Sequence, residues 1–97
     1  MSAAGSDGAI TRVMKIVNEK GLHARASAKF VQLVEKYDAT VKVSRNDDSA
    51  GGDSIMGLMM LAAGIGTSIT VTATGPEAKD VIAALATLVS TRFGEDE

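Results

Sequence analysis

His23 and the residues around it are the segment of this sequence whose residue types could act together in a reaction. His23 is the only histidine among 97 residues, with Gly21 just before it and Arg25 just after it. An imidazole is a nucleophile near neutral pH, and a guanidinium can hold phosphate oxygens through two parallel hydrogen bonds. Although a lone histidine in a turn is more often an ordinary surface residue, these neighbours favour transient attachment of a phosphoryl group to His23, with Arg25 contacting the phosphate.

The start of a helix at this point would strengthen that chemistry. The first N–H groups of a helix have no partner within the helix, and together with the helix dipole they favour a bound anion. The same field disfavours an imidazolium, so it biases His23 toward its neutral, nucleophilic form. Gly21 would let the backbone turn tightly just before the histidine.

The remaining composition argues against several other kinds of chemistry. The chain has no cysteine, which excludes disulfides and Cys-ligated zinc, and one histidine cannot build a multi-histidine metal site within one chain. We find no Gly-rich loop with Lys-Ser or Lys-Thr for a nucleotide, no cluster of acids for magnesium and no second catalytic group beside the histidine. The sequence therefore predicts a phosphoryl carrier, not an enzyme, with neither a cofactor nor a metal.

Charge and hydropathy indicate what the protein does not bind. The formal net charge is −2, and aromatic residues make up 3% of the chain, so the basic, aromatic-rich surface of a nucleic-acid-binding protein is not expected. No apolar run approaches the roughly 20 residues of a membrane span. The first residues do not resemble a signal peptide, and together with the lack of cysteine this favours a cytoplasmic location.

Hydrophobic periodicity predicts that strands and helices alternate along the chain. The best strand is 68–74, where Ile69, Val71 and Ala73 share one face and hydroxyl residues share the other. A sheet with one polar face is covered on one side only, so we expect an antiparallel α+β layer structure. Further strands are expected at 10–18, 39–45 and 49–53, and helices at 24–37, at 54–61 and from Pro76 to before Gly94. One domain would span residues 10–93, between a flexible tail at 1–9 and an acidic tail at 94–97.

Three segments, in the right order, resemble the HPr family, the histidine-containing phosphocarriers of the bacterial phosphoenolpyruvate-dependent phosphotransferase system. They are Gly21-Leu22-His23-Ala24-Arg25 followed by Ala28 and Phe30-Val31; Ser54-Ile55-Met56-Gly57-Leu58-Met59; and the strand and helix start from Ile69 to Ala78. The resemblance covers residues 13 to 93. It implies an open-faced β-sandwich in which three helices cover one face of a four-stranded antiparallel sheet.

The resemblance also implies a reaction. Enzyme I, charged by phosphoenolpyruvate, would phosphorylate Nδ1 of His23, and an enzyme IIA-type acceptor would then take the phosphoryl group. Arg25 would be the arginine that contacts the phosphate. Where the family commonly has proline after this arginine, the chain has Ala26, which implies a first helical turn that is less rigid before a partner binds.

A second site is expected at Ser54. A serine before an apolar helical segment is most simply an N-cap, and the resemblance adds phosphorylation by an HPr kinase/phosphorylase; both can hold. Leu58 and Leu61 are expected in the core. Too many apolar residues remain for one buried face, so Ile55, Met56 and Met59 are predicted to form an exposed patch near His23 that binds partners together with Ala24. By contrast, Lys29, Gln32, Glu35 and Lys36 are expected on a solvated helix face.

Two other functions stay open at this point. A regulatory interaction module of the same fold that no longer transfers phosphate is the main alternative, although such a module would not need His23. A small RNA-binding α+β domain is more remote, because the turn at Gly64-Ile65-Gly66 has no basic neighbours. A carrier must expose His23 to two partners in turn, which favours a monomer. The residues do not distinguish sugar uptake from a nitrogen-related regulatory branch.

Overall fold

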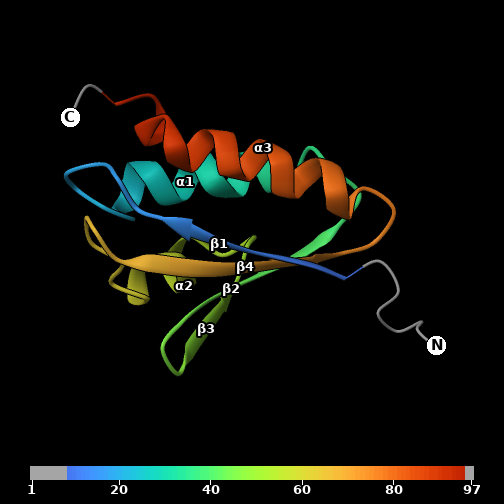
Figure 1. Ribbon diagram of the computed structural model, residues 1–97, viewed down its shortest axis with the longest axis horizontal. Helices are drawn as coiled ribbons and strands as arrows, with labels where there is room; N and C mark the ends of the chain where they lie inside the picture. Colours follow the sequence, from blue (N-terminus) through green and yellow to red (C-terminus); the bar gives the residue numbers. More distant parts are fainter. Residues whose placement is uncertain (1–8, 96–97) are drawn as a thin grey trace.

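Four antiparallel strands form one sheet in the computed structural model, which describes residues 9–95. The sheet order is β1-β4-β2-β3, and three helices and a short 3-10 turn complete the fold (Figure 1). The elements are β1 (Ile10–Lys15), α1 (Ala24–Val34), β2 (Thr40–Arg45), β3 (Asp48–Gly51), α2 (Ile55–Met60), β4 (Ser68–Thr74), α3 (Ala78–Ser90) and η1 (Arg92–Gly94). This is the predicted α+β fold, with the predicted order of elements.

The core lies between the sheet and its helices. Strand β4 pairs with β1 on one side and β2 on the other, and its Ile69, Val71 and Ala73 are fully buried. Helices α1 and α3 lie over this face of the sheet (Figure 1). Phe30 of α1 and Leu85 of α3 are buried in the core between the helices and the sheet. Helix α2 packs against α1 and β3, and its Leu58 joins the same core. The alternating apolar side chains of residues 68–74 therefore form the surface on which α1 and α3 pack, and these two helices flank the candidate site.

Most predicted elements end earlier than expected. The strand expected at 49–53 ends at Gly51, the helix expected at 54–61 ends at Met60, and the last helix, expected to run to just before Gly94, ends at Ser90. The first strand stops at Lys15, and the segment that follows bends so that the N–H of Gly21 bonds the carbonyl of Asn18 at 3.2 Å. The first helix stops at Val34, because Lys36 and Tyr37 bond the carbonyls three residues before them instead of four. Such bonds tighten the chain into a turn that leads to β2.

The segment after α3 turns back over the body of the protein. Its Phe93 is fully buried, although both Arg92 and Phe93 have left-handed backbones, with φ of 60° and 55°. A left-handed conformation costs each non-glycine residue roughly 1–2 kcal/mol, and burial of the aromatic ring, worth roughly 1.5–3 kcal/mol, opposes that cost. This turn was not predicted, and it brings Glu95 to the loop that carries His23. Within residues 9–95, no helix is both long and apolar enough to cross a membrane.

Candidate functional site

The loop between β1 and α1 fixes the position of His23. Gly21 has φ of +64°, which favours glycine, and a Cβ added there would lie 2.4 Å from the carbonyl oxygen of Ala63. Both its backbone conformation and the lack of space therefore require glycine at this position. The next residue, Leu22, is buried and donates its N–H to the same carbonyl at 3.0 Å. The loop is therefore tied to the turn that follows α2, and His23 emerges from a rigid base.

His23 is the N-cap residue of α1, and its side chain makes no capping hydrogen bond. The first helical bond runs from the N–H of Ser27 to the carbonyl of His23, at 2.8 Å. Within residues 9–95, the N–H groups of Ala24, Arg25 and Ala26 have no hydrogen-bond partner. These three donors lie at the positive end of the helix dipole, an arrangement that can hold an anion.

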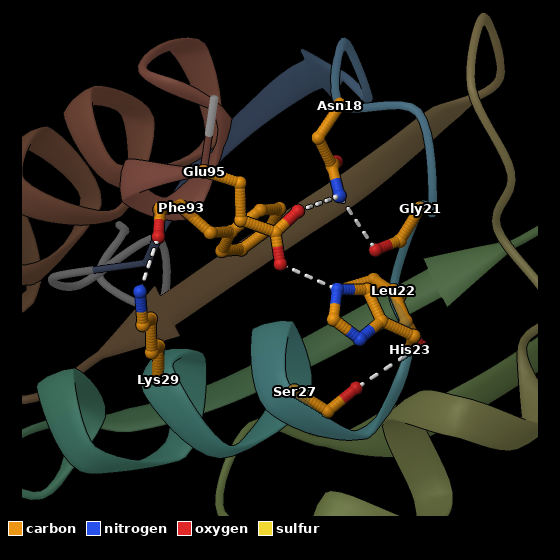
Figure 2. Close-up of polar contacts among 8 residues, drawn as sticks. All are labelled: Asn18, Gly21, Leu22, His23, Ser27, Lys29, Phe93 and Glu95. Atoms are coloured by element: carbon orange, nitrogen blue, oxygen red, sulfur yellow. Dashed lines mark hydrogen bonds and ion pairs between the residues drawn. The ribbon is translucent and has the colours of Figure 1, made fainter. Parts of the chain in front are cut away.

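The imidazole of His23 is held at its edge by a carboxylate. Nε2 lies 2.6 Å from Oε2 of Glu95, while the side-chain amide of Asn18 donates to Oε1 of Glu95 at 3.1 Å and to the carbonyl of Gly21 at 2.9 Å (Figure 2). The His23 side chain is 26% exposed, and that of Glu95 is 8% exposed. The other ring nitrogen, Nδ1, is turned toward the first turn of α1 (Figure 2). The ring therefore reaches solvent with one nitrogen bonded and the other turned toward the start of α1.

Sequence reasoning missed both Glu95 and Asn18. Burial alone would raise the pKa of Glu95, but hydrogen bonds from His23 and Asn18 outweigh burial, aided by the positive charges of His23 and Lys20, so the pKa is lowered from its ordinary 4.5. One signal in the sequence could have found Glu95. Phe93 is an aromatic residue in a polar tail, and its burial requires that tail to fold back onto the protein.

Basic side chains surround the exposed edge of the ring. A hollow of about 520 Å³ is lined by Lys20, His23, Ala24, Arg25, Lys29, Gly94 and Glu95. Arg25 is exposed at its rim and makes no hydrogen bond or ion pair with the other residues that the structure describes. Its guanidinium is thus available to an incoming anion, and it shares this hollow with His23.

The expectation that Lys29 lies on a solvated helix face is wrong. Lys29 is only partly exposed, and its ammonium donates to the carbonyl of Phe93 at 2.6 Å. Because Lys29 follows Arg25 by four residues, the two share one face of α1, and that face looks onto the C-terminal turn. Gln32, Glu35 and Lys36 are exposed, as expected.

Ser54 is the N-cap of α2, and this prediction is confirmed. Its hydroxyl accepts the N–H of Gly57 at 3.0 Å, and the residue is partly exposed. Beyond it, Ile55 is 42%, Met56 69% and Met59 39% exposed, while Leu58 and Leu61 are buried as predicted. Met60, which the predicted patch left out, is 76% exposed.

A smaller hollow lies between the His23 loop and the turn that follows α2. It has a volume of about 220 Å³ and is lined by Lys20, Leu22, His23, Ala62, Ala63 and Gly64. The last three of these residues follow α2 directly, so the surface runs from the imidazole to the end of the helix that carries the exposed apolar side chains. Ala24 is also exposed, next to the ring.

Comparison with known proteins gives a consistent result. The family model described as PTS HPr component phosphorylation site matches residues 10–91. A phosphocarrier protein HPr of Cupriavidus necator is 48% identical over 91% of this chain and 99% of that relative, and one of Neisseria meningitidis is 45% identical over 87% and 94%. The crystal structure of HPr-C-His from Thermoanaerobacter tengcongensis aligns with a TM-score of 0.86 at 33% identity, covering 91% of this chain and 99% of that one.

Proposed function

The chain belongs to the HPr family of phosphocarrier proteins, and we propose that it accepts a phosphoryl group from enzyme I on His23 and passes it to an enzyme IIA-type acceptor. Its general role is that of a phosphocarrier of the phosphotransferase system, not of a catalytic enzyme. The observation that carries the finer proposal is the open start of α1. There a partly exposed imidazole lies beside three N–H groups that lack partners within residues 9–95.

In this proposal, Nδ1 of His23 is the nitrogen that takes the phosphoryl group. A phosphoryl group on Nδ1 would lie toward the first turn of α1, where the N–H groups of Ala24, Arg25 and Ala26 can donate to its oxygens. The guanidinium of Arg25 can neutralise part of the remaining charge through a forked hydrogen bond. Donors fixed by the backbone need little rearrangement as charge develops during transfer.

The proposed partner surface is the patch of Ile55, Met56 and Met59 together with Ala24. These side chains are exposed, and a hollow links the end of α2 to His23. Methionine side chains adapt to differently shaped surfaces, which suits a carrier that must meet a donor and then an acceptor. A small patch of this kind supports fast release, as a carrier requires.

We also propose that Ser54 is a regulatory site, modified by an HPr kinase/phosphorylase. Phosphate at this N-cap would keep oxygens that accept the N–H of Gly57, so α2 itself would tolerate it. The added charge would lie next to Ile55 and Met56, and a docking partner would have to desolvate it. A Ser54→Asp variant should therefore be phosphorylated on His23 more slowly than the wild type; an unchanged rate would count against the regulatory role.

The carrier role is tested by incubation with phosphoenolpyruvate and enzyme I. Intact-mass measurement should show a gain of one phosphate that is lost in acid, because a phosphohistidine is acid-labile and a phosphoserine is not. His23→Ala should show no gain, and Ser54→Ala should gain phosphate as the wild type does. A gain that persists in His23→Ala would contradict the proposal.

A further inference from the structure

Both oxygens of the Glu95 carboxylate face hydrogen-bond donors. Oε1 accepts from the side-chain amide of Asn18 at 3.1 Å, and that amide is turned toward Glu95 by its second bond, to the carbonyl of Gly21. Oε2 lies 2.6 Å from Nε2 of His23. An ionised carboxylate can only accept, so the neutral imidazole must keep its hydrogen on Nε2. The contact therefore selects one of the two tautomers of the ring.

We propose that Glu95 is a positioning residue for phosphoryl transfer, because its carboxylate holds the hydrogen of His23 on Nε2 and so leaves the lone pair on Nδ1. This inference rests on the proposed function, since it explains which nitrogen receives the phosphoryl group. Nδ1 is the nitrogen that faces the first turn of α1 (Figure 2), the turn whose first N–H groups have no partner within residues 9–95. The tautomer set at one edge of the ring thus directs the nucleophile toward the anion site at the other.

The same contact serves the product of the transfer. As the lone pair of Nδ1 forms a bond to phosphorus, the bond from phosphorus to the donor's leaving atom breaks, and its electron pair goes to that atom. The ring then carries a positive charge, because Nε2 keeps its hydrogen, and the carboxylate of Glu95 lies beside that charge. Transfer to the acceptor reverses these changes. Neither step requires a proton to move, which leaves Glu95 ionised and in place throughout.

Glu95 owes its position to packing of the segment before it. The ring of Phe93 is fully buried, and the ammonium of Lys29 holds the carbonyl of Phe93 at 2.6 Å (Figure 2). Arg92 and Phe93 both keep left-handed backbones in this turn. Two residues beyond the buried ring, the side chain of Glu95 is only 8% exposed. The carboxylate is thus part of the folded site and not a group on a loose tail.

Nitrogen NMR of the protein labelled with [15N]histidine tests the tautomer directly, and one histidine gives one pair of ring signals. In mildly alkaline buffer, the wild type should show a protonated Nε2 and an unprotonated Nδ1. Glu95→Gln keeps the shape of the side chain but replaces one acceptor with an NH2 group, which must then face His23 or Asn18. Where it faces His23, Nε2 becomes the acceptor and the hydrogen moves to Nδ1. The Nδ1 signal should therefore shift toward that of a protonated nitrogen.

Phosphorylation by enzyme I and phosphoenolpyruvate supplies the second measurement. Glu95→Gln and Glu95→Ala should both be phosphorylated more slowly, by roughly tenfold to a hundredfold, the range seen when a partner that orients a metal-ligating histidine is removed. The matched control is Glu19→Gln, which removes the same charge from an exposed position in the loop before His23. It should keep both the wild-type tautomer and the wild-type rate.

The possible results separate the two proposals. If the wild type takes up phosphate and the ring signals of both Glu95 variants match those of the wild type, the positioning role is overturned and the proposed function stands. A wild type that takes up no phosphate on His23 would overturn the proposed function. An equal slowing in Glu19→Gln would also overturn the positioning role, because it would assign the effect to charge in general.

Discussion

Helices α1 and α2 begin in opposite ways. At α2, the hydroxyl of Ser54 accepts a helix N–H, whereas at α1 the side chain of His23 makes no capping bond and turns to Glu95 instead. A serine cap typically stabilises a helix by about 1 kcal/mol, which α1 forgoes. Within residues 9–95, α1 thus leaves its first N–H groups open at the very point where a phosphoryl group would need them, while the cap of α2 occupies one of its own, that of Gly57.

The largest expected effect comes from replacing His23 with a serine, which could cap α1 as Ser54 caps α2. His23→Ser and His23→Ala should both lose phosphate uptake completely, since neither keeps an imidazole. Both variants also lose the contact with Glu95, but the new serine hydroxyl can cap the free N–H groups of α1. His23→Ser should therefore be more stable than His23→Ala by about 1 kcal/mol in urea unfolding. Equal stability of the two variants would mean that these N–H groups are not open to a cap.

The next effect concerns the loop on which the open helix start depends. Gly21→Ala would have to hold φ of +64° and place its Cβ 2.4 Å from a backbone oxygen, so we expect a loss of about 2 kcal/mol or more. Gly66→Ala is the matched control, because it has φ of +87° but no atom within 4 Å of the added Cβ. It should lose only about 1 kcal/mol, the cost of the left-handed backbone alone. Urea unfolding of the two variants measures the difference, and similar losses would show that the loop can move away from Ala63.

Removing the cap of α2 should have a smaller effect, and on stability alone. Ser54→Ala takes away the acceptor for the N–H of Gly57 and should cost about 1 kcal/mol. Phosphate uptake on His23 should stay within about twofold of the wild type, because the cap lies outside the imidazole site. Ser49→Ala, at an exposed strand position, should change stability by less than about 0.5 kcal/mol. If the two serine variants lost the same stability, the capping bond would not contribute.

Patterns carried by neighbouring residues predicted most of the fold. The strand Ser68–Thr74 was predicted to the residue because its side chains alternate strictly, and α1 starts where the turn at Gly21 indicated. The end of α1 was missed, since Leu33 and Tyr37 continue the helical spacing although the backbone tightens there. Periodicity reports which residues are buried, but it does not report which carbonyl an N–H selects.

The candidate site was predictable only as far as its local part. His23 and Arg25 lie within three residues, and both line one hollow. Glu95 is 72 residues from His23, in a segment whose composition suggests an acidic tail. Its position depends on the buried ring of Phe93 and on the left-handed backbones of Arg92 and Phe93. No periodic sequence pattern predicts such a turn. Contacts between distant segments need the packed core, which the sequence specifies only as a whole.

The smallest effect should appear as a dependence of stability on pH. Burial alone would raise the pKa of Glu95, but hydrogen bonds from His23 and Asn18, with the charges of His23 and Lys20, lower it below 4.5. Arg25 and Lys29 line the same hollow and add to the positive surroundings. A lowered pKa in the folded chain means that folding favours the ionised carboxylate. Its contribution should be fully present above about pH 4.5 and should fall away as the pH drops through the lowered value.

Glu95→Gln removes that titration while keeping the size of the side chain. The wild type should be more stable than this variant at neutral pH, by no more than about 1 kcal/mol, and the difference should vanish in acid. Glu19→Gln should leave the pH dependence unchanged, since Glu19 is exposed. Urea unfolding across the acid range makes the comparison. A difference that persisted at low pH would mean that Glu95 stabilises the chain by packing and not by its charge. The two helix starts would then differ in the missing cap of α1 and not in the carboxylate.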